Sequence, residues 1–179
     1  MTIRQKILDI AKERILILDG GMGSLIQALN LGKICNDHLC IANPQKIIDI
    51  HEAYLKAGAD IIETCSFNST FISLAEYGLE YQAYEISAAA ARIARECVNR
   101  FPAQDKPRFV AGSVGPTAKG ASLYPDINNP GKRTITWDEL EAAYYDNVKG
   151  LWDGGVDMFI VETVFDTLNA KAAFFAISR

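Results

Sequence analysis

Two segments of the chain, 57–64 and 154–163, have nearly the same sequence. The first is Ala-Gly-Ala-Asp-Ile-Ile-Glu-Thr and the second is Gly-Gly-Val-Asp-Met-Phe-Ile-Val-Glu-Thr. Each contains the glycine of a helix end, an acidic turn residue, and a short apolar run that closes on a glutamate and a threonine. The repeat predicts a β/α unit that occurs more than once and whose buried strands end in polar side chains.

Short apolar runs of the strand type occur along the chain at 15–18, 60–63, 109–112 and 157–162. Nearly every residue in these runs is apolar, so both faces of each strand must be covered. This pattern is typical of a parallel sheet. Helical patterns separate the strands, as a parallel sheet requires, and they are expected at 22–29, 44–57, 80–99, 137–152 and 166–179, with a further amphipathic stretch at 1–12.

Several of these helices carry recognisable end signals. Asn43 is the expected N-cap of the helix at 44–57, Pro44 occupies its first position, and Gly58 is its expected stop. Thr136 and Glu139 have the spacing of a capping box. The signals therefore fix the helix boundaries better than periodicity alone.

Four β/α units in series predict an α/β fold, either an open sheet or the first half of a (β/α)8 TIM barrel. A complete barrel takes about 250 residues, and the helical pattern at 166–179 runs to the last residue without a glycine or proline stop. We therefore expect residues 1–179 to be the N-terminal part of a barrel domain, with the chain truncated and the remainder of the barrel absent.

Composition excludes several classes of function. The chain has 179 residues, of which 49% are hydrophobic and 22% charged, and a net charge of −4, which fits one globular domain. It has neither an apolar run near the ~20 residues that span a bilayer nor the Lys/Arg cluster that nucleic-acid binding needs. We expect a cytoplasmic protein with a small-molecule ligand and with neither a membrane nor a nucleic-acid partner.

The cysteines do not have the spacing of a zinc site or of a redox pair. We expect reduced, buried thiols and no metal ligands within the chain, and only the cysteine that follows the second strand is expected near a site. No chemical role is expected for either histidine. The residues are Cys35, Cys40, Cys65, Cys97, His38 and His51.

Polar side chains follow each predicted strand. Because the carboxyl ends of parallel strands meet at one edge of a sheet, these side chains are expected to form a half-ring where such enzymes bind ligands. Its members are Asp19, Glu63 with Thr64, Ser113, and Glu162 with Thr163. Singly, each carboxylate could stabilise a turn or pair with a basic residue, but three at equivalent positions favour a site.

The segment Asp19-Gly-Gly-Met-Gly23 links the first strand to a helical pattern. Its glycines permit backbone conformations that aim N–H groups outward at a helix N-terminus, and such a nest binds anions. It lacks the spacing of a dinucleotide fingerprint. A carboxylate in this nest and an ammonium group against Asp19 and Glu162 would describe an α-amino acid. The alternative is a tight turn without a ligand.

Five parts of the chain carry a more specific signal, and they are residues 18–24, 57–64 with 67–70, 111–117, 124–126 and 161–172, of which the last is the most specific. Together they resemble the homocysteine S-methyltransferase family, and within it the N-terminal homocysteine-binding module of cobalamin-dependent methionine synthases. The resemblance covers essentially the whole chain.

The resemblance implies a TIM barrel in which Asp19 and Glu162 receive the ammonium group of homocysteine. The substrate carboxylate is implied to bind backbone N–H groups, and other residues are implied to line the mouth of the site. The implied carboxylate site comprises Gly20, Gly21, Met22, Gly23 and Ser113, and the mouth comprises Thr64, Asn68 and the loop 115–117.

Members of the family hold the homocysteine sulfur on a zinc ion bound by three cysteine thiolates, which keeps the sulfur deprotonated and nucleophilic. The implied zinc ligands lie beyond Arg179. In methionine synthases the methyl donor is methylcobalamin, recharged from methyltetrahydrofolate, and separate modules carry both. The resemblance therefore implies a protein that makes methionine, with this chain inactive alone and no catalytic residue within it.

Three alternatives stay open. One is a stand-alone homocysteine methyltransferase that uses betaine or S-methylmethionine. Another is a Mg²⁺-dependent barrel lyase in which Asp19, Glu63 and Glu162 bind the ion. The last is a non-catalytic binding or assembly fragment, because half a barrel leaves its first and fourth strands as unpaired edges that favour self-association.

Overall fold

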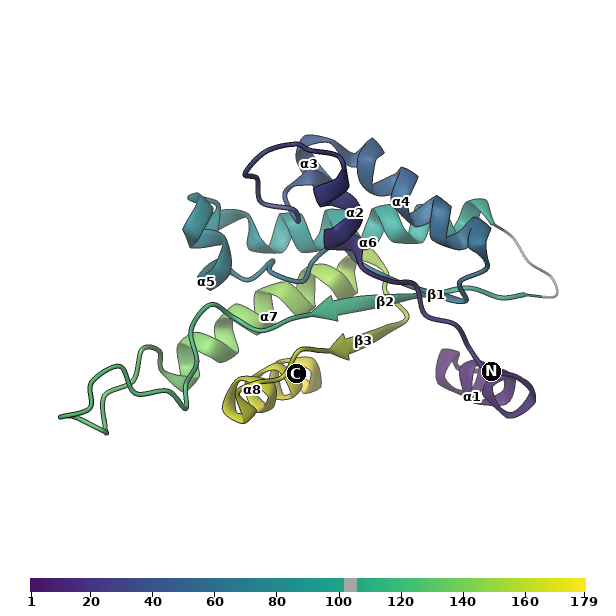
Figure 1. Ribbon diagram of the computed structural model, residues 1–179. Helices are drawn as coiled ribbons and strands as arrows, with labels where there is room; N and C mark the ends of the chain where they lie inside the picture. Colours follow the sequence, from purple (N-terminus) through teal and green to yellow (C-terminus); the bar gives the residue numbers. More distant parts are fainter. Residues whose placement is uncertain (102–105) are drawn as a thin grey trace.

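The computed structural model describes residues 1–101 and 106–179 as helices that alternate with parallel strands (Figure 1). The elements in chain order are α1 (Ile3–Glu13), α2 (Met22–Ala28), α3 (Leu39–Ala42), α4 (Pro44–Ala57), β1 (Ile61–Glu63), α5 (Phe71–Leu74), the 3₁₀ turns η1 (Ala75–Tyr77) and η2 (Glu80–Gln82), α6 (Ala83–Arg100), β2 (Phe109–Val114), α7 (Trp137–Gly154), β3 (Met158–Val161) and α8 (Thr167–Ser178).

The described strands form one parallel sheet in the order β1-β2-β3. Ile61 lies opposite Phe109, and Ala111 lies opposite Met158. All six residues of β2 are buried, as expected for the central strand of a covered sheet. The structure confirms the predicted α/β class and its parallel pairing.

The first predicted strand, 15–18, is reduced to a single parallel bridge between Leu18 and Ile61. Its backbone does approach β1, because the N–H of Ile61 donates to the carbonyl of Ile17 at 3.1 Å. Its other side meets no strand in the described chain, and Ile15 is 82% exposed. Because this edge segment is paired on a single side, few hydrogen bonds hold it in regular strand geometry.

The other strand predictions shift by one or two residues. β2 continues to Val114, so Ser113 lies within the strand instead of following it. β1 and β3 each begin one residue later than expected, because Asp60 and Asp157 use their side chains to bond the preceding strand.

The helix-end signals are mostly confirmed. Gly58 and Gly155 end their helices in the left-handed conformation, with φ of 107° and 95°. The Thr136–Glu139 capping box is present in α7. Asn43 does occupy the N-cap of α4, but its side chain makes no capping hydrogen bond. The helix predicted at 80–99 is divided, with η2 preceding α6.

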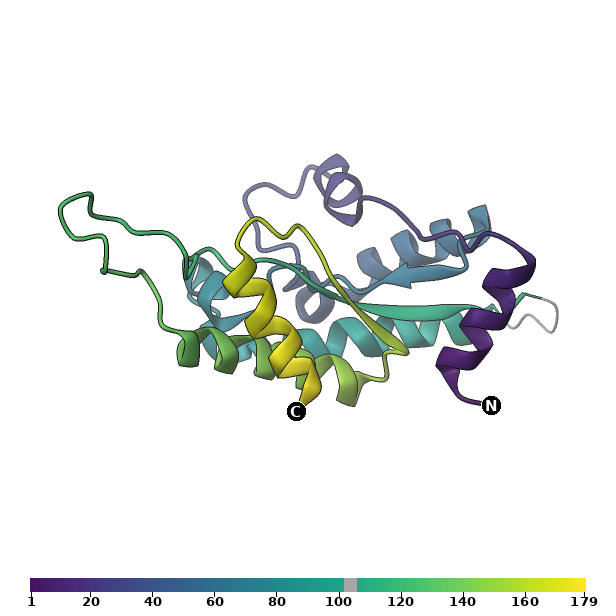
Figure 2. The same cartoon turned by 90° about the horizontal axis from the view of Figure 1, so that it is seen from below.

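Helices α6 and α7 pack along each other beside the sheet (Figures 1 and 2). Their closest approach lies at two glycines of α7. A Cβ at Gly150 would lie 2.6 Å from the carbonyl oxygen of Tyr84, and one at Gly154 would lie 2.5 Å from the Cβ of Ala91. This contact fixes α7, and with it the strand that follows, against the rest of the sheet. By contrast, α1 has no buried residue and lies beyond the amino ends of the strands (Figure 1).

Within the described ranges, none of the helices combines the length and the apolar character that crossing a membrane requires. The cytoplasmic location stays a prediction.

Candidate functional site

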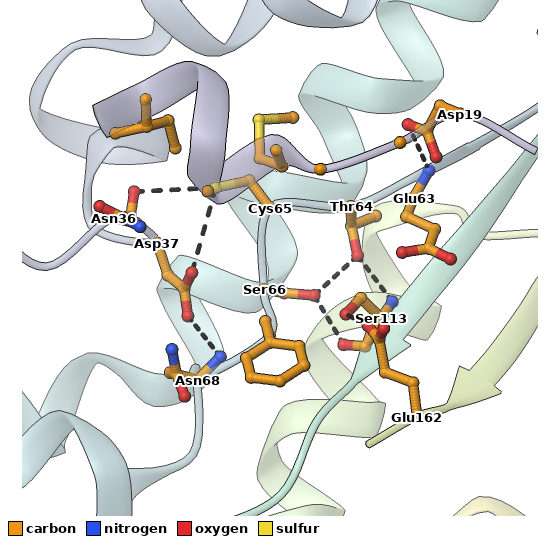
Figure 3. Close-up of a pocket in the computed structure, with 16 residues that line it drawn as sticks. Asp19, Asn36, Asp37, Glu63, Thr64, Cys65, Ser66, Asn68, Ser113 and Glu162 are labelled. Carbon is orange, nitrogen blue, oxygen red and sulfur yellow. Dashed lines mark hydrogen bonds between the residues drawn. The ribbon is translucent and has the colours of Figure 1, made fainter. Parts of the chain in front are cut away.

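A cavity of about 360 Å³ lies at the carboxyl ends of the strands (Figure 3). Its walls come from the turn after Leu18, the loop after β1, Ser113 of β2 and Glu162 after β3. Four carboxylates line it, whereas none of the described lining residues is basic; the carboxylates are Asp19, Asp37, Glu63 and Glu162. This is the edge at which parallel α/β folds bind ligands.

Asp19 is partly buried in the wall of this cavity. Its Oδ2 accepts a hydrogen bond from the backbone N–H of Glu63 at 3.0 Å, while its Oδ1 is buried with no partner in the described chain. Burial raises the pKa of Asp19 to about 7, and the nearby carboxylates of Glu63 and Glu162 act in the same direction. An acceptor of this kind is suited to a ligand that brings a positive charge.

The other two carboxylates of the half-ring face the same space. Glu63 is partly buried, and its pKa is raised first by that burial and then by Glu162. The Glu162 carboxylate accepts a hydrogen bond from the hydroxyl of Ser113, which fixes its position (Figure 3). The structure therefore brings together Asp19, Glu63 and Glu162, which are far apart in the sequence.

The glycine-rich turn 20–23 also lines the cavity. None of its glycines has a positive φ, so the turn does not depend on left-handed conformations. They provide space instead, since a Cβ at Gly20 would lie 3.0 Å from the Tyr54 hydroxyl oxygen and one at Gly21 would lie 3.2 Å from Ser24 Oγ. Gly21 is the N-cap of α2 and offers no side-chain cap, so the N–H groups of the first turn are left without a side-chain acceptor among the described residues.

Thr64 and Ser113 are bound to each other. The Thr64 hydroxyl accepts from the Ser113 N–H at 2.9 Å and shares a hydrogen bond with Ser66 Oγ at 2.7 Å. Ser66 Oγ in turn donates to the Ser113 carbonyl at 2.8 Å. The Ser113 N–H is therefore occupied and not available to a substrate carboxylate, which corrects the implied role. Both residues line the cavity. The Thr64 hydroxyl holds the backbone N–H of Ser113, and the Ser113 hydroxyl donates to the Glu162 carboxylate.

The mouth of the site differs from the expectation in one part. Asn68 lines the cavity, whereas the loop 115–117 does not. Gly115 lies directly against Phe67, and this packing turns the loop away. Pro116 and Thr117 instead line a neighbouring hollow of about 320 Å³ that shares Asn68 with the cavity.

Sequence reasoning missed Asp37, which is fully buried in the wall. Its Oδ2 accepts from the Asn68 N–H at 2.7 Å, and Cys65 Sγ lies 4.0 Å from its Oδ1. Burial raises the pKa of Asp37 to about 7. Asp37 follows no strand and starts no long helix, so no spacing in the sequence singled it out.

The cysteines are free and buried, as predicted. The pKa of Cys65 is raised by a hydrogen bond with Cys40 and by burial, and burial raises the pKa of Cys97 to about 11. Within residues 1–101 and 106–179, no group of three His, Cys, Asp or Glu side chains is placed to hold a metal ion. The described residues therefore do not fit a magnesium site made by the half-ring, and the zinc ligands that the resemblance implies beyond Arg179 stay a prediction.

His51 is a further buried titratable group. Burial lowers its pKa to about 4, which keeps it neutral at physiological pH. It lies in the core face of α4 and does not line the cavity.

Parallel β/α units with an acidic cavity at the carboxyl ends of the strands define a part of a TIM-barrel-like α/β protein. The family model of homocysteine S-methyltransferase matches residues 16–179. The chain therefore belongs to the homocysteine S-methyltransferase family.

Solved structures agree on the fold. The homocysteine methyltransferase MmuM from Escherichia coli matches in its metallated form with a TM-score of 0.74 and 24% identity, over 95% of this chain and 61% of that one. Its oxidized form matches with a TM-score of 0.72 and 26% identity, over 92% and 58%. The chain thus spans about three fifths of the length of this relative, and its fold is the matching part of that barrel.

Proposed function

We propose that this chain is the homocysteine-binding, N-terminal part of a methyltransferase barrel. The observation that carries the proposal is the unpartnered Oδ1 of Asp19, buried in a cavity with four carboxylates and no basic side chain among the described lining residues. A buried carboxylate oxygen without a partner is costly, so the ligand is expected to supply the missing positive charge. The α-ammonium group of an amino acid does so.

The place of the ligand's carboxylate follows from the turn 20–23, which comes directly after Asp19. The open N–H groups at the start of α2 provide partial positive charge for a carboxylate. With its ammonium group between Asp19 and Glu162 and its carboxylate at the turn 20–23, homocysteine would extend its thiol toward the mouth near Asn68. The chain's own residues thus bind and orient the substrate, and we assign no bond-making step to them.

This binding mode is tested by isothermal calorimetry on the intact protein with homocysteine and with 4-mercaptobutyrate, which has the same thiol and carboxylate but no ammonium group. We expect homocysteine to bind at least about 30-fold more tightly, as loss of a charge-assisted hydrogen bond implies. Equal affinity for the two compounds would show that the carboxylates do not recognise an ammonium group.

A zinc ion is part of the chemistry that the family resemblance implies, where it would keep the substrate sulfur deprotonated. We assign no step to it, because the described residues do not fit a zinc site. Ligands beyond Arg179 stay a prediction. Metal analysis of the intact protein tests it, and about one zinc per chain, with added sulfur coordination when homocysteine binds, is the expected result.

For the methyl donor we propose methylcobalamin, recharged from methyltetrahydrofolate by other modules, as in methionine synthases. Segments 111–117 and 161–172 support this choice through their resemblance to that group. The alternative is a stand-alone homocysteine methyltransferase that uses betaine or S-methylmethionine as donor. Methionine formation by the intact protein with each donor in turn decides between them.

An assembly role is the remaining candidate. β3 has a neighbour on one side only in the described part of the sheet, and Ile15 and Ile17 at the opposite edge are 82% and 52% exposed. Both edges would be covered by the rest of the barrel or by a second copy of the chain. Sedimentation of residues 1–179 alone is expected to show concentration-dependent self-association, and a strictly monomeric chain would contradict this.

A further inference from the structure

Thr163, directly after Glu162, has a backbone conformation that is unusual for its residue type. Its φ is +54°, and within the described ranges the only other non-glycine residue with a positive φ is Asn30. Asparagine enters the left-handed region readily, whereas a β-branched residue there is a genuine outlier. Strain of this kind persists only where the surroundings impose it, and it concentrates at functional sites.

The Thr163 side chain does not account for the conformation. It is exposed, and its hydroxyl makes no hydrogen bond with any described residue. The two flanks impose the turn instead. On one side the Glu162 N–H continues the sheet by donating to the Val114 carbonyl at 3.1 Å. On the other side Asp166 caps α8 and accepts from the N–H of Ser122 at 2.8 Å.

What the turn achieves is seen at Glu162. Its carboxylate contacts the Ser113 hydroxyl in the cavity (Figure 3). Its backbone N–H still bonds the neighbouring strand, and the left-handed turn follows at the next residue, Thr163. The same Glu-Thr pair at the end of β1 has no such reversal, because Thr64 has no positive φ and its backbone N–H continues the ladder to Ala111 at 2.9 Å.

We propose that Thr163 is a positioning residue whose left-handed backbone turn holds the Glu162 carboxylate in the cavity for the substrate ammonium group. The inference rests on the proposed function, because the turn can position Glu162 for the substrate only if Glu162 binds the substrate. The restriction of the backbone, and not the hydroxyl, performs this role. Residues that favour the left-handed region should therefore preserve it, and a residue that frees the backbone should weaken it.

The test uses Thr163→Asn and Thr163→Gly in the intact protein, with homocysteine affinity measured by calorimetry and stability by thermal unfolding. Asparagine accepts a positive φ while restricting the chain, so we expect unchanged affinity and a melting temperature higher by about 2 °C. Glycine relieves the strain but adds freedom, so we expect affinity to fall about fivefold without a loss of stability.

Asn30→Gly is the matched control, since it frees the other left-handed non-glycine residue, at the end of α2 and outside the cavity lining. It should leave homocysteine affinity unchanged. Wild-type affinity in Thr163→Gly would overturn the inference while leaving the proposed function intact, and so would an equal loss in Thr163→Asn. A wild-type protein that does not bind homocysteine would overturn both.

Discussion

The repeated segments 57–64 and 154–163 begin in the same way in the structure. In both, a left-handed glycine ends a helix and an aspartate clamps the preceding strand with two hydrogen bonds. The Asp60 N–H donates to the Ile17 carbonyl at 2.7 Å and its Oδ2 accepts from the Ile17 N–H at 2.8 Å. Asp157 makes the same pair of bonds with Val110, both at 2.8 Å.

The two segments end differently. Thr64 is buried and bound to Ser113, whereas Thr163 is exposed and left-handed. The difference arises because β2 continues beside the end of β1, while Asp166 pulls the chain after β3 into the cap of α8. Local sequence therefore determines how these strands start, and neighbouring elements determine how they end.

The largest expected effect tests the shared beginning. Asp60→Ala should lower the free energy of unfolding by about 3 kcal/mol, because it leaves the Ile17 N–H unpaired and removes the partner of Arg14. Asp157→Ala should lower it by about 2 kcal/mol, because Asp157 pairs with one cation, Arg95, in addition to the Val110 N–H, whereas Asp60 pairs with both Arg14 and Lys106. Urea unfolding measures both.

Asp9→Ala is the control for this pair. It removes an exposed ion pair with Lys12 within α1 and should leave the unfolding midpoint unchanged. A loss in Asp60→Ala no greater than in the control would contradict the clamp.

The next effect compares the glutamates at the two strand ends. Glu162→Gln should weaken homocysteine binding about 30-fold, because the side chain proposed to meet the ammonium group loses its charge. Glu63→Gln should weaken binding only about threefold, because the lost attraction between Glu63 and the ammonium group is partly offset by a lower pKa of Asp19. If calorimetry showed a larger loss of affinity in Glu63→Gln than in Glu162→Gln, Glu63 and not Glu162 would be the partner of the ammonium group.

A pH dependence follows from Asp19, whose pKa burial raises to about 7. An ammonium group binds the ionised carboxylate, so protonation of Asp19 opposes binding and affinity rises with pH. Between pH 6 and pH 8 the affinity for homocysteine should increase about tenfold, while the substrate ammonium stays protonated. In Glu63→Gln the midpoint should move to lower pH, because one repulsive charge is removed. A flat profile in the wild-type protein would rule out Asp19 as the ammonium partner.

The smallest effect compares the threonines. Thr64→Val should cost about 1 kcal/mol of unfolding free energy, because the buried Ser113 N–H loses its acceptor. Thr163→Val should cost almost nothing, since it keeps the β-branched shape and removes an exposed, unbonded hydroxyl. Thermal unfolding that shows equal losses would mean that the two ends are more alike than the structure indicates.

The sequence predicted those features that depend on neighbours within a few residues. Gly58, the Thr136 capping box and the strand that leads to Glu162 all have local signals, and the structure has all of them. Asp37 and the strained turn at Thr163 depend on contacts across the fold, so no local sequence pattern predicted them. The first strand was overpredicted for the same reason, since its regularity depends on a neighbour that local sequence does not encode.

The most direct test of the account is a crystal structure of the intact protein with homocysteine. We expect the substrate nitrogen within about 3 Å of the Asp19 and Glu162 carboxylates, and the substrate carboxylate at the N–H groups of the turn 20–23. A substrate whose carboxylate or sulfur faces Asp19, or a cavity that stays empty at saturating homocysteine, would contradict the central claim.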